Sequence, residues 1–239
     1  MNLPPLYQVW IGPPRHWFYD LCMETVRKHN PDVLLVTDPR EILGDIPKEI
    51  LDDHFSPVHR CDWIRKMLLW KTGGAYIDAD FICWHPLDTV RFLANWWDSV
   101  LYREWHGTGC ADGICAGRKG SDFWKSAADM ALERIREVYP KEPAWLACGS
   151  ETLNIIYEKY KWKRVILLPS HLIQPVSIAD FSWFAADVTS DVPSGFECFG
   201  WMVSKHIMTP FLEQFNGPNE FLHSKSRLAW LIRYALDYL

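Results

Sequence analysis

Hydrophobic positions follow two spacings along the chain, and together they predict alternating strands and helices. Short apolar runs bounded by glycine, proline or asparagine indicate buried strands, and apolar residues three or four positions apart indicate helices. The expected strands are residues 6–12, 33–36, 75–77, 99–104, 113–116 and 165–168. The expected helices are residues 15–29, 47–53, 57–72, 90–97, 122–139, 150–159 and 219–239. The order begins β-α-β-α-α-β, which predicts the nucleotide-binding half of a doubly wound α/β sheet.

The stretch from residue 56 to residue 85 carries the strongest local signals. Ser56 is a suitable N-cap, and Pro57 suits the first helical position, where its missing N–H costs nothing. Gly73 and Gly74 end the helix, because glycine adopts the left-handed conformation without a steric penalty. A long helix followed by a short buried strand is therefore expected here.

Two acids, Asp78 and Asp80, follow the predicted strand 75–77. Acids two apart in a strand point to the same side, and converging carboxylates are unfavourable unless a cation binds them. They predict a site for a hard divalent metal with room for phosphate oxygens, although a plain polar turn is the alternative. Asp62 and Arg65 lie three apart on one face of the preceding helix, and an arginine there is suited to neutralise a diphosphate.

Seven residues reproduce the pattern D-x-x-R followed by G-G-x-Y-x-D-x-D: Asp62, Arg65, Gly73, Gly74, Tyr76, Asp78 and Asp80. This pattern resembles the DXD-containing glycosyltransferases of the capsular-polysaccharide and mannosyltransferase type, and the glucosylating clostridial toxins. The resemblance implies a GT-A fold, which is a Rossmann-like mixed sheet flanked by helices. It also implies a nucleotide-sugar donor and Mn²⁺ (or Mg²⁺) as cofactor.

The resemblance extends to the first strand, where Gln8, Trp10 and Ile11 match the family's opening segment. It implies that these residues hold the nucleotide, with Trp10 stacked on the base, whereas packing in the core is the alternative role for Trp10. Thr37 ends the second predicted strand, and ligands of open α/β sheets gather at such ends. Asp112 stands where the family usually has asparagine, so the contacts to sugar hydroxyls are expected to differ.

Roles for the metal-binding residues also follow from the resemblance. Asp80 is expected to coordinate the metal directly, and Asp78 to bind ribose or sugar hydroxyls and assist the metal. Residues 201–206 resemble a late segment of the family that carries a further ligand for the metal or diphosphate. His206 is the candidate third ligand, and a structural histidine is the alternative.

Three further roles concern the donor sugar and its diphosphate. Arg65 is expected to offset the negative charge that develops on the leaving phosphate or to hold the donor sugar, and it is counted as catalytic together with Asp78 and Asp80. Asp62 is expected to accept hydrogen bonds from sugar hydroxyls. Tyr76 is expected to support the diphosphate, with a core position as the alternative.

Composition limits the function class and the compartment. A net charge of −5 with dispersed basic residues argues against a nucleic-acid-binding protein. Seven cysteines without paired or metal-binding spacing indicate reduced thiols, so a cytoplasmic location is expected. The start of the chain does not show the pattern of a signal peptide, and no apolar stretch reaches transmembrane length.

The interpretation is a single glycosyltransferase domain over residues 1–239, with a nucleotide-binding half over about 1–110 and an acceptor-side half over about 111–239. It is expected to move a hexose from a UDP-sugar, or alternatively a GDP-sugar, to a hydroxyl of a glycan, lipid-linked or protein acceptor. The resemblance implies retention of anomeric configuration and a role in glycan or polysaccharide synthesis.

Two other classes stay open. One is a haloacid-dehalogenase-like phosphohydrolase or phosphotransferase with Asp78 as nucleophile, but residues 81–83 do not fit the pattern such enzymes need after the second acid. The other is a non-catalytic module that binds a nucleotide sugar, against which the presence of both acids and Arg65 counts.

Overall fold

The chain forms two compact units that interleave along the sequence. The structure is a computed structural model and describes residues 2–104, 109–161, 163–177, 180–188 and 198–237. The first unit comprises Met1–Pro13, Val33–Asp78 and Asp88–Leu168. The second unit comprises Pro14–Asp32, Ala79–Leu87 and Pro169–Leu239. The expected single domain, with a nucleotide-binding half and an acceptor-side half that meet near residue 110, stays a prediction.

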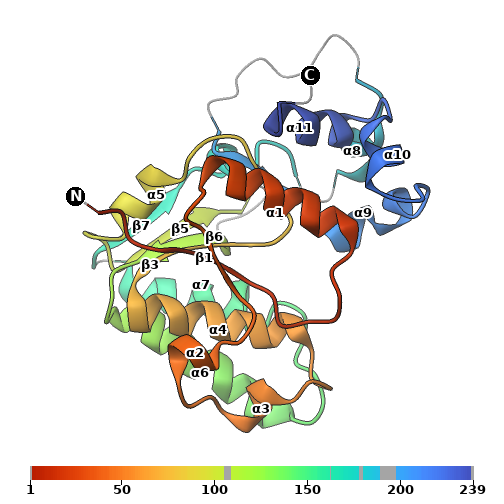
Figure 1. The fold of residues 1–239 in the computed structure, drawn as a ribbon. Coiled ribbons are helices and arrows are strands. Elements are labelled where there is room, and N and C mark those ends of the chain that lie inside the picture. The colour runs from red at the N-terminus through yellow and green to blue at the C-terminus, as the bar shows by residue number, and fades with distance from the viewer. Residues whose placement is uncertain (1, 105–108, 162, 178–179, 189–197, 238–239) are drawn as a thin grey trace. The chain divides into compact units, whose positions relative to one another are not determined.

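The first unit is built on a six-stranded mixed sheet (Figure 1). The strands in spatial order are β2 (Leu34–Val36), β1 (Leu6–Val9), β3 (Gly74–Ile77), β6 (Cys110–Gly117), β5 (Ser99–Arg103) and β7 (Val165–Leu168). β1 is parallel to both β2 and β3, as predicted, whereas β6 is antiparallel to its two neighbours. The predicted fold class, an α/β fold with a mixed sheet flanked by helices, is confirmed.

Helices flank this sheet, with α4, α6 and α7 together on one face (Figure 1). The helices of the unit are α2 (Arg40–Leu43), α3 (Lys48–Leu51), α4 (Pro57–Thr72), α5 (Asp88–Leu93), α6 (Asp122–Val138) and α7 (Ser150–Tyr160). α4 and α6 pack against each other through buried side chains that include Ile64, Leu68, Phe123 and Ala127. The apolar sides of α4 and α6 face the sheet.

The limits of α4 follow the local signals in part. Pro57 is its first residue, and Gly73 ends it at a φ of 70°, where a Cβ would lie 2.6 Å from the backbone N of Lys119. Glycine is therefore needed both for its conformation and for the close approach. Ser56 is the N-cap residue, as predicted, but its hydroxyl makes no capping hydrogen bond, and the fixed φ of Pro57 begins the helix without it.

The second unit consists of helices around a two-stranded antiparallel sheet. Its elements are α1 (Trp17–His29), β4 (Phe81–Cys83), the 3₁₀ turn η1 (Ser170–Leu172), α8 (Phe181–Ala185), β8 (Gly200–Met202), α9 (Lys205–Leu212), α10 (Pro218–Leu222) and α11 (Arg227–Ala235). β4 pairs with β8 in the register Phe81↔Met202. A second core forms here, with Trp84, Trp201 and Phe221 among its buried aromatic residues.

The predicted single helix over residues 219–239 is wrong. The structure has α10 and α11 in that range, separated by residues 223–226, and residues 238–239 lie outside the described part. Ser226 starts the second helix, because its Oγ accepts a hydrogen bond from the backbone N of Ala229 at 3.2 Å. All seven cysteines are free, as predicted, and no helix in the described ranges is long and apolar enough to cross a bilayer.

Candidate active site

The carboxyl ends of β1, β2 and β3 lie at one edge of the first unit's sheet, because the three strands are parallel neighbours. Gln8 is buried in β1, and its Nε2 lies 3.5 Å from the backbone O of Asp78. The backbone N–H of Trp10 donates to the carbonyl of Val36 at 2.9 Å, and the exposed Thr37 follows. The structure therefore brings the predicted nucleotide-binding residues to neighbouring strand ends.

Trp10 and Ile11 have different surroundings at this edge. The indole N–H of Trp10 donates to the carbonyl of Pro13 at 2.9 Å, which orients the ring, and the side chain is only partly buried. Ile11 packs against the hydrophobic core of the unit. A partly buried ring at a strand end suits stacking on a planar ligand, whereas Ile11 has a packing contact that explains its apolar character.

Arg65 is the centre of the buried polar part of the site, with a side chain that is 7% exposed. Its NH2 lies 3.3 Å from Asp62 Oδ1 and 3.1 Å from Asp78 Oδ1. Its NH1 lies 3.3 Å from Asp112 Oδ1 and donates to the backbone O of Asp112 at 3.1 Å. The guanidinium also lies over the ring of Tyr76, with Cζ 4.5 Å from the ring centroid.

One donor of Arg65 is left over by these contacts. Its Nε is buried and has no hydrogen-bond acceptor among the described residues. An unpaired buried donor is costly. The predicted role of Arg65 toward an anionic donor stays a prediction.

Local structure explains how these side chains meet. Asp62, Arg65 and Lys66 lie three and four residues apart on α4 and therefore share one face of the helix. β3 then carries Tyr76 and, one residue past its end, Asp78. The pairing of β3 with β6 brings Asp112 to the same place, since β6 runs antiparallel beside β3.

Lys66 and Asp112 complete a cluster that the sequence pattern did not predict. Lys66 is fully buried, and its Nζ lies 3.0 Å from Asp112 Oδ2 and 3.0 Å from the carbonyl O of Asp62. With Arg65 and Asp78, the cluster holds three carboxylates and two cations. The sequence does contain one indication of this cluster, because Lys66 lies four residues after Asp62, on the helix face that also carries Arg65.

Burial and charge act in opposite directions on the acids of the cluster. Burial raises the pKa of Asp62, and the neighbouring Lys66 and Arg65 do not offset it fully. Burial also acts to raise the pKa of Asp112, but Arg65 and Lys66 outweigh it and lower that pKa below its ordinary value. Asp112 is therefore the acid whose ionised form the cluster stabilises, and Asp62 is the acid whose ionised form it disfavours.

Tyr76 is held as a hydrogen-bond donor. Burial, with a contribution from Asp78, raises the pKa of Tyr76 well above its ordinary value, although Arg65 acts against this. Its hydroxyl donates to Asp78 Oδ1 at 2.7 Å, the same oxygen that faces Arg65 NH2. The ring of Tyr76 is therefore buried in the core while its hydroxyl orients a candidate site carboxylate, and its role toward a diphosphate stays a prediction.

The expectation that Asp78 and Asp80 share one strand is wrong. β3 ends at Ile77, and residues 79–80 form a turn before β4 begins at Phe81. The reason is that β4 pairs with β8 and not with a strand of the larger sheet, so the chain turns between the two. The acids are placed by a turn, and alternation along a strand does not apply to them.

Asp80 is fixed within the second unit by the start of α9. Its backbone O accepts from the N–H of Val203 at 3.1 Å, and its Oδ2 accepts from the N–H of Lys205 at 3.2 Å. The positive end of a helix dipole stabilises a carboxylate at such a position. His206 follows Lys205 and is exposed. Residues 201–206, which were predicted to carry a third ligand, therefore contain the backbone groups that bind Asp80.

The donor atoms suit a hard divalent cation that also binds a substrate. Two carboxylates, Asp78 and Asp80, are oxygen ligands of the kind Mg²⁺ and Mn²⁺ prefer, and Mg²⁺ commonly takes one or two carboxylates together with substrate phosphates. No group of three or more His, Cys, Asp or Glu side chains with metal-binding geometry is found within the described ranges.

Comparison with known proteins supports the predicted class. Residues 19–97, which include Asp62, Arg65, Asp78 and Asp80, match the family described as "Glycosyltransferase sugar-binding region containing DXD motif". Members with this motif commonly use a divalent metal, a nucleotide-sugar donor and an acceptor. The prediction of a glycosyltransferase is confirmed at this level.

A second comparison concerns the fold. A solved structure titled "PaToxG Glycosyltransferase" is similar at a TM-score of 0.50 and 15% identity, with 96% of this chain and 85% of that chain covered. At this identity the similarity concerns the fold. No curated protein matches the chain.

Proposed function

We propose that the protein is a metal-dependent glycosyltransferase that moves a hexose from a nucleoside diphosphate sugar to an acceptor hydroxyl, with retention of configuration. A UDP-sugar is the favoured donor and a GDP-sugar the alternative. The capsular-polysaccharide and mannosyltransferase type is the closest description, with a glycan, lipid-linked or protein acceptor and a role in glycan or polysaccharide synthesis. The observation that carries the proposal is the buried guanidinium of Arg65, which faces three carboxylates.

Arg65 would act on the charge of the leaving group. The carboxylates around it hold the planar guanidinium in one orientation, and they raise its pKa although burial alone would lower it. A cation held rigidly before the reaction stabilises developing negative charge without reorganisation. The contacts thus support Arg65 as a fixed positive group for the donor diphosphate.

Asp62 and Tyr76 would orient the donor and the cluster. Asp62 lies at the same face of α4 as Arg65 and is only 4% exposed, which suits hydrogen bonds from sugar hydroxyls in place of water. Tyr76 holds Asp78 in place through its hydroxyl. Asp78 then needs no rearrangement to accept from ribose or sugar hydroxyls or to assist a cation.

Asp80 would coordinate Mn²⁺ or Mg²⁺ directly, with Asp78 and His206 as the proposed further ligands and the other ligand oxygens supplied by the donor diphosphate. A divalent cation in that position supplies Lewis-acid stabilisation of the β-phosphate as the glycosidic bond breaks. Asp80 is suited to this role because the backbone N–H of Lys205 already orients its carboxylate. Retention of configuration is proposed without a covalent carboxylate intermediate, because no acid is assigned to that role.

The nucleotide would lie at the ends of β1 and β2. Trp10 would stack on the base, and Gln8, Ile11 and Thr37 would line the same edge. Fixed orientation of the indole by the carbonyl of Pro13 supports this placement. A cytoplasmic location is part of the proposal, since all seven cysteines are free and six of them are buried, as is usual in a reducing compartment.

Thermal-shift measurements with a panel of nucleotide sugars, each with and without Mn²⁺, test the donor. A ligand that binds only the native state raises the melting temperature, so a shift for one donor that needs Mn²⁺ is expected. The release of the nucleoside diphosphate from that donor then tests for turnover. A trapped phosphoaspartate would instead identify a phosphotransferase, and donor binding without any turnover would identify a binding module.

A further inference from the structure

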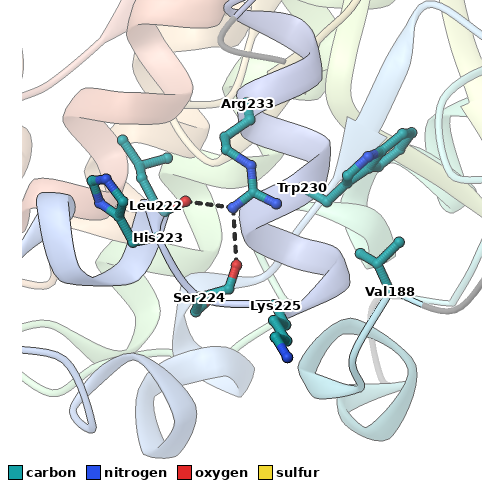
Figure 2. A pocket seen from close by; sticks show the side chains of 7 residues that line it. All are labelled: Val188, Leu222, His223, Ser224, Lys225, Trp230 and Arg233. Carbon is teal, nitrogen blue, oxygen red and sulfur yellow. Dashed lines mark hydrogen bonds between the residues drawn. The ribbon is translucent and has the colours of Figure 1, made fainter.

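The second unit contains a pocket of about 440 Å³ beside the start and middle of α11. Figure 2 shows its lining, which comes from α10, the turn before α11, α11 itself and the segment at residue 188. The lining residues are Val188, Leu222, His223, Ser224, Lys225, Trp230 and Arg233. None of them belongs to the candidate glycosyltransferase site, so the pocket needs an explanation of its own.

Arg233 is held in the pocket in an unusual way. Its NH1 donates to the carbonyls of Leu222 and Ser224, the second at 2.9 Å, and both bonds are drawn in Figure 2. These bonds fix the guanidinium but give it no carboxylate, and within the described ranges it has no ion pair. Because burial is the influence that lowers its pKa, the charge is partly desolvated, and the described residues place no carboxylate against it.

The contacts of Arg233 leave a defined edge for a ligand. NH1 is occupied by carbonyl oxygens, so Nε and NH2 remain, and Figure 2 shows the second terminal nitrogen turned away from the two carbonyls. Two parallel N–H groups on one edge of a guanidinium match the two oxygens of a phosphate or carboxylate. The pocket therefore contains an anion-binding edge that is already oriented.

Lys225 adds a second positive charge to the pocket. Lys225 and His223 are exposed and form no ion pair with any residue that the structure describes. None of the seven lining residues is acidic, although the whole chain has a net charge of −5. A local excess of positive charge on an acidic protein favours an anionic ligand.

The remaining wall is apolar. Trp230 is positioned by stacking on Tyr234, with ring centroids 5.3 Å apart and an interplanar angle of 24°. Val188 lies on the same side of the pocket in Figure 2. A fixed indole next to a cationic edge suits a ligand that joins a phosphate to an apolar face, such as the ring of a sugar or the glycerol of a lipid headgroup.

We propose that this pocket binds a phosphate monoester, with the phosphate on the Nε and NH2 edge of Arg233, the attached group against Trp230, and Lys225 adding to the positive potential of the pocket. The ligand is either a soluble sugar phosphate or the phosphate headgroup of a lipid, which share this chemistry. The proposal does not depend on the sugar-transfer function, because the pocket residues and the candidate transferase residues are different.

Calorimetric titration of the full chain with glucose 1-phosphate tests the soluble ligand, with glucose as the neutral comparison. Sedimentation with phosphatidylcholine vesicles that contain phosphatidic acid, compared with vesicles that lack it, tests the headgroup. The variants are Lys225→Gln and Arg233→Gln, and Lys141→Gln is the matched control, since Lys141 is exposed and lies in the other unit.

Binding of one of the two phosphate ligands is expected, with Lys225→Gln weakening it about tenfold and Lys141→Gln leaving it unchanged. Arg233→Gln is expected to abolish it; if that variant does not fold, the exposed Lys225 still gives the answer. Binding of glucose 1-phosphate assigns the soluble ligand, and binding to phosphatidic acid vesicles alone assigns the headgroup. Failure of both ligands to bind, equal binding of glucose, or affinity unchanged by Lys225→Gln would overturn the proposal.

Discussion

Removing the amine of Lys66 is the sharpest test of the buried charge cluster. Lys66→Met keeps a side chain of similar length but removes the charge that lies 3.0 Å from Asp112 Oδ2. Lys66 is 0% exposed and the side chain of Asp112 is 10% exposed, so water cannot replace the lost partner. Asp112 would retain Arg65 at 3.3 Å but lose the closer of its two cations.

The expected loss of stability follows from the cost of an uncompensated buried charge. Breaking a buried ion pair by removing one partner typically costs about 3–5 kcal/mol. Because Arg65 remains beside Asp112, we expect Lys66→Met to lower the free energy of unfolding by about 3 kcal/mol. Replacing both partners should be far less harmful, because no unpaired charge remains. Lys66→Met with Asp112→Asn is therefore expected to lose about 1 kcal/mol, which is about 2 kcal/mol less than Lys66→Met alone, so the two substitutions are not additive.

Urea unfolding of the wild type, both single variants and the double variant measures this coupling. Lys48→Met is the control, because Lys48 is exposed, and its free energy of unfolding should stay within about 0.5 kcal/mol of the wild type. The pH dependence adds a second readout. The pKa of Asp112 is lower in the folded state than its unfolded value of about 4, so ionised Asp112 stabilises the fold above about pH 4. This stabilisation is lost as the pH falls through the folded-state pKa, and it should be smaller in Lys66→Met. Additive effects of the two substitutions would refute the coupling.

Three further predictions concern the donor site and its acids. Arg65→Lys keeps the charge but loses the planar fork, so kcat should fall at least about tenfold with little change in KM, and a rise in KM alone would limit Arg65 to holding the ground state. Trp10→Ala should weaken the nucleoside diphosphate about tenfold and the nucleotide sugar equally, since stacking involves the base; unchanged affinity would make Trp10 a packing residue. The raised pKa of Asp62 means that the folded state binds its proton more tightly, so stability should fall as pH rises above about 4. Asp62→Asn should remove that loss and stabilise the protein at pH 7, as measured by denaturation at pH 4 to 8. A less stable Asp62→Asn variant at pH 7 would instead make Asp62 a stabilising partner of Arg65.

The parts of the fold that depend on local chemistry could be predicted. Pro57 and Gly73 mark the two ends of α4, and the apolar runs of β1, β2 and β3 give three parallel strands in the right sequence. Asp62, Arg65 and Asp78 meet as predicted, because helix spacing and the strand after the glycines bring them together. These features are set within a few residues of where they occur.

What could not be predicted depends on contacts between distant segments. Lys66 is buried because β6 brings Asp112 beside it, 46 residues further along the chain. Asp80 lies in a turn because β4 pairs with β8, about 120 residues away, in the register Phe81↔Met202. Alternation along a strand, which was the basis for placing both acids together, gives no information about such a pairing.

The role of Asp80 in metal-dependent transfer is the central claim, and Asp80→Asn tests it most directly. The amide keeps the size of the side chain and an oxygen for the N–H of Lys205, so the fold should be retained. Glu24→Gln, an exposed acid of the same unit, is the control. The measurement is Mn²⁺-dependent release of nucleoside diphosphate from the best donor of the thermal-shift panel. A fall in kcat on the order of 10³-fold with an unchanged melting temperature is expected, since the metal supplies several kcal/mol to the transition state. Turnover near that of the wild type, with the same dependence on Mn²⁺, would contradict the assignment.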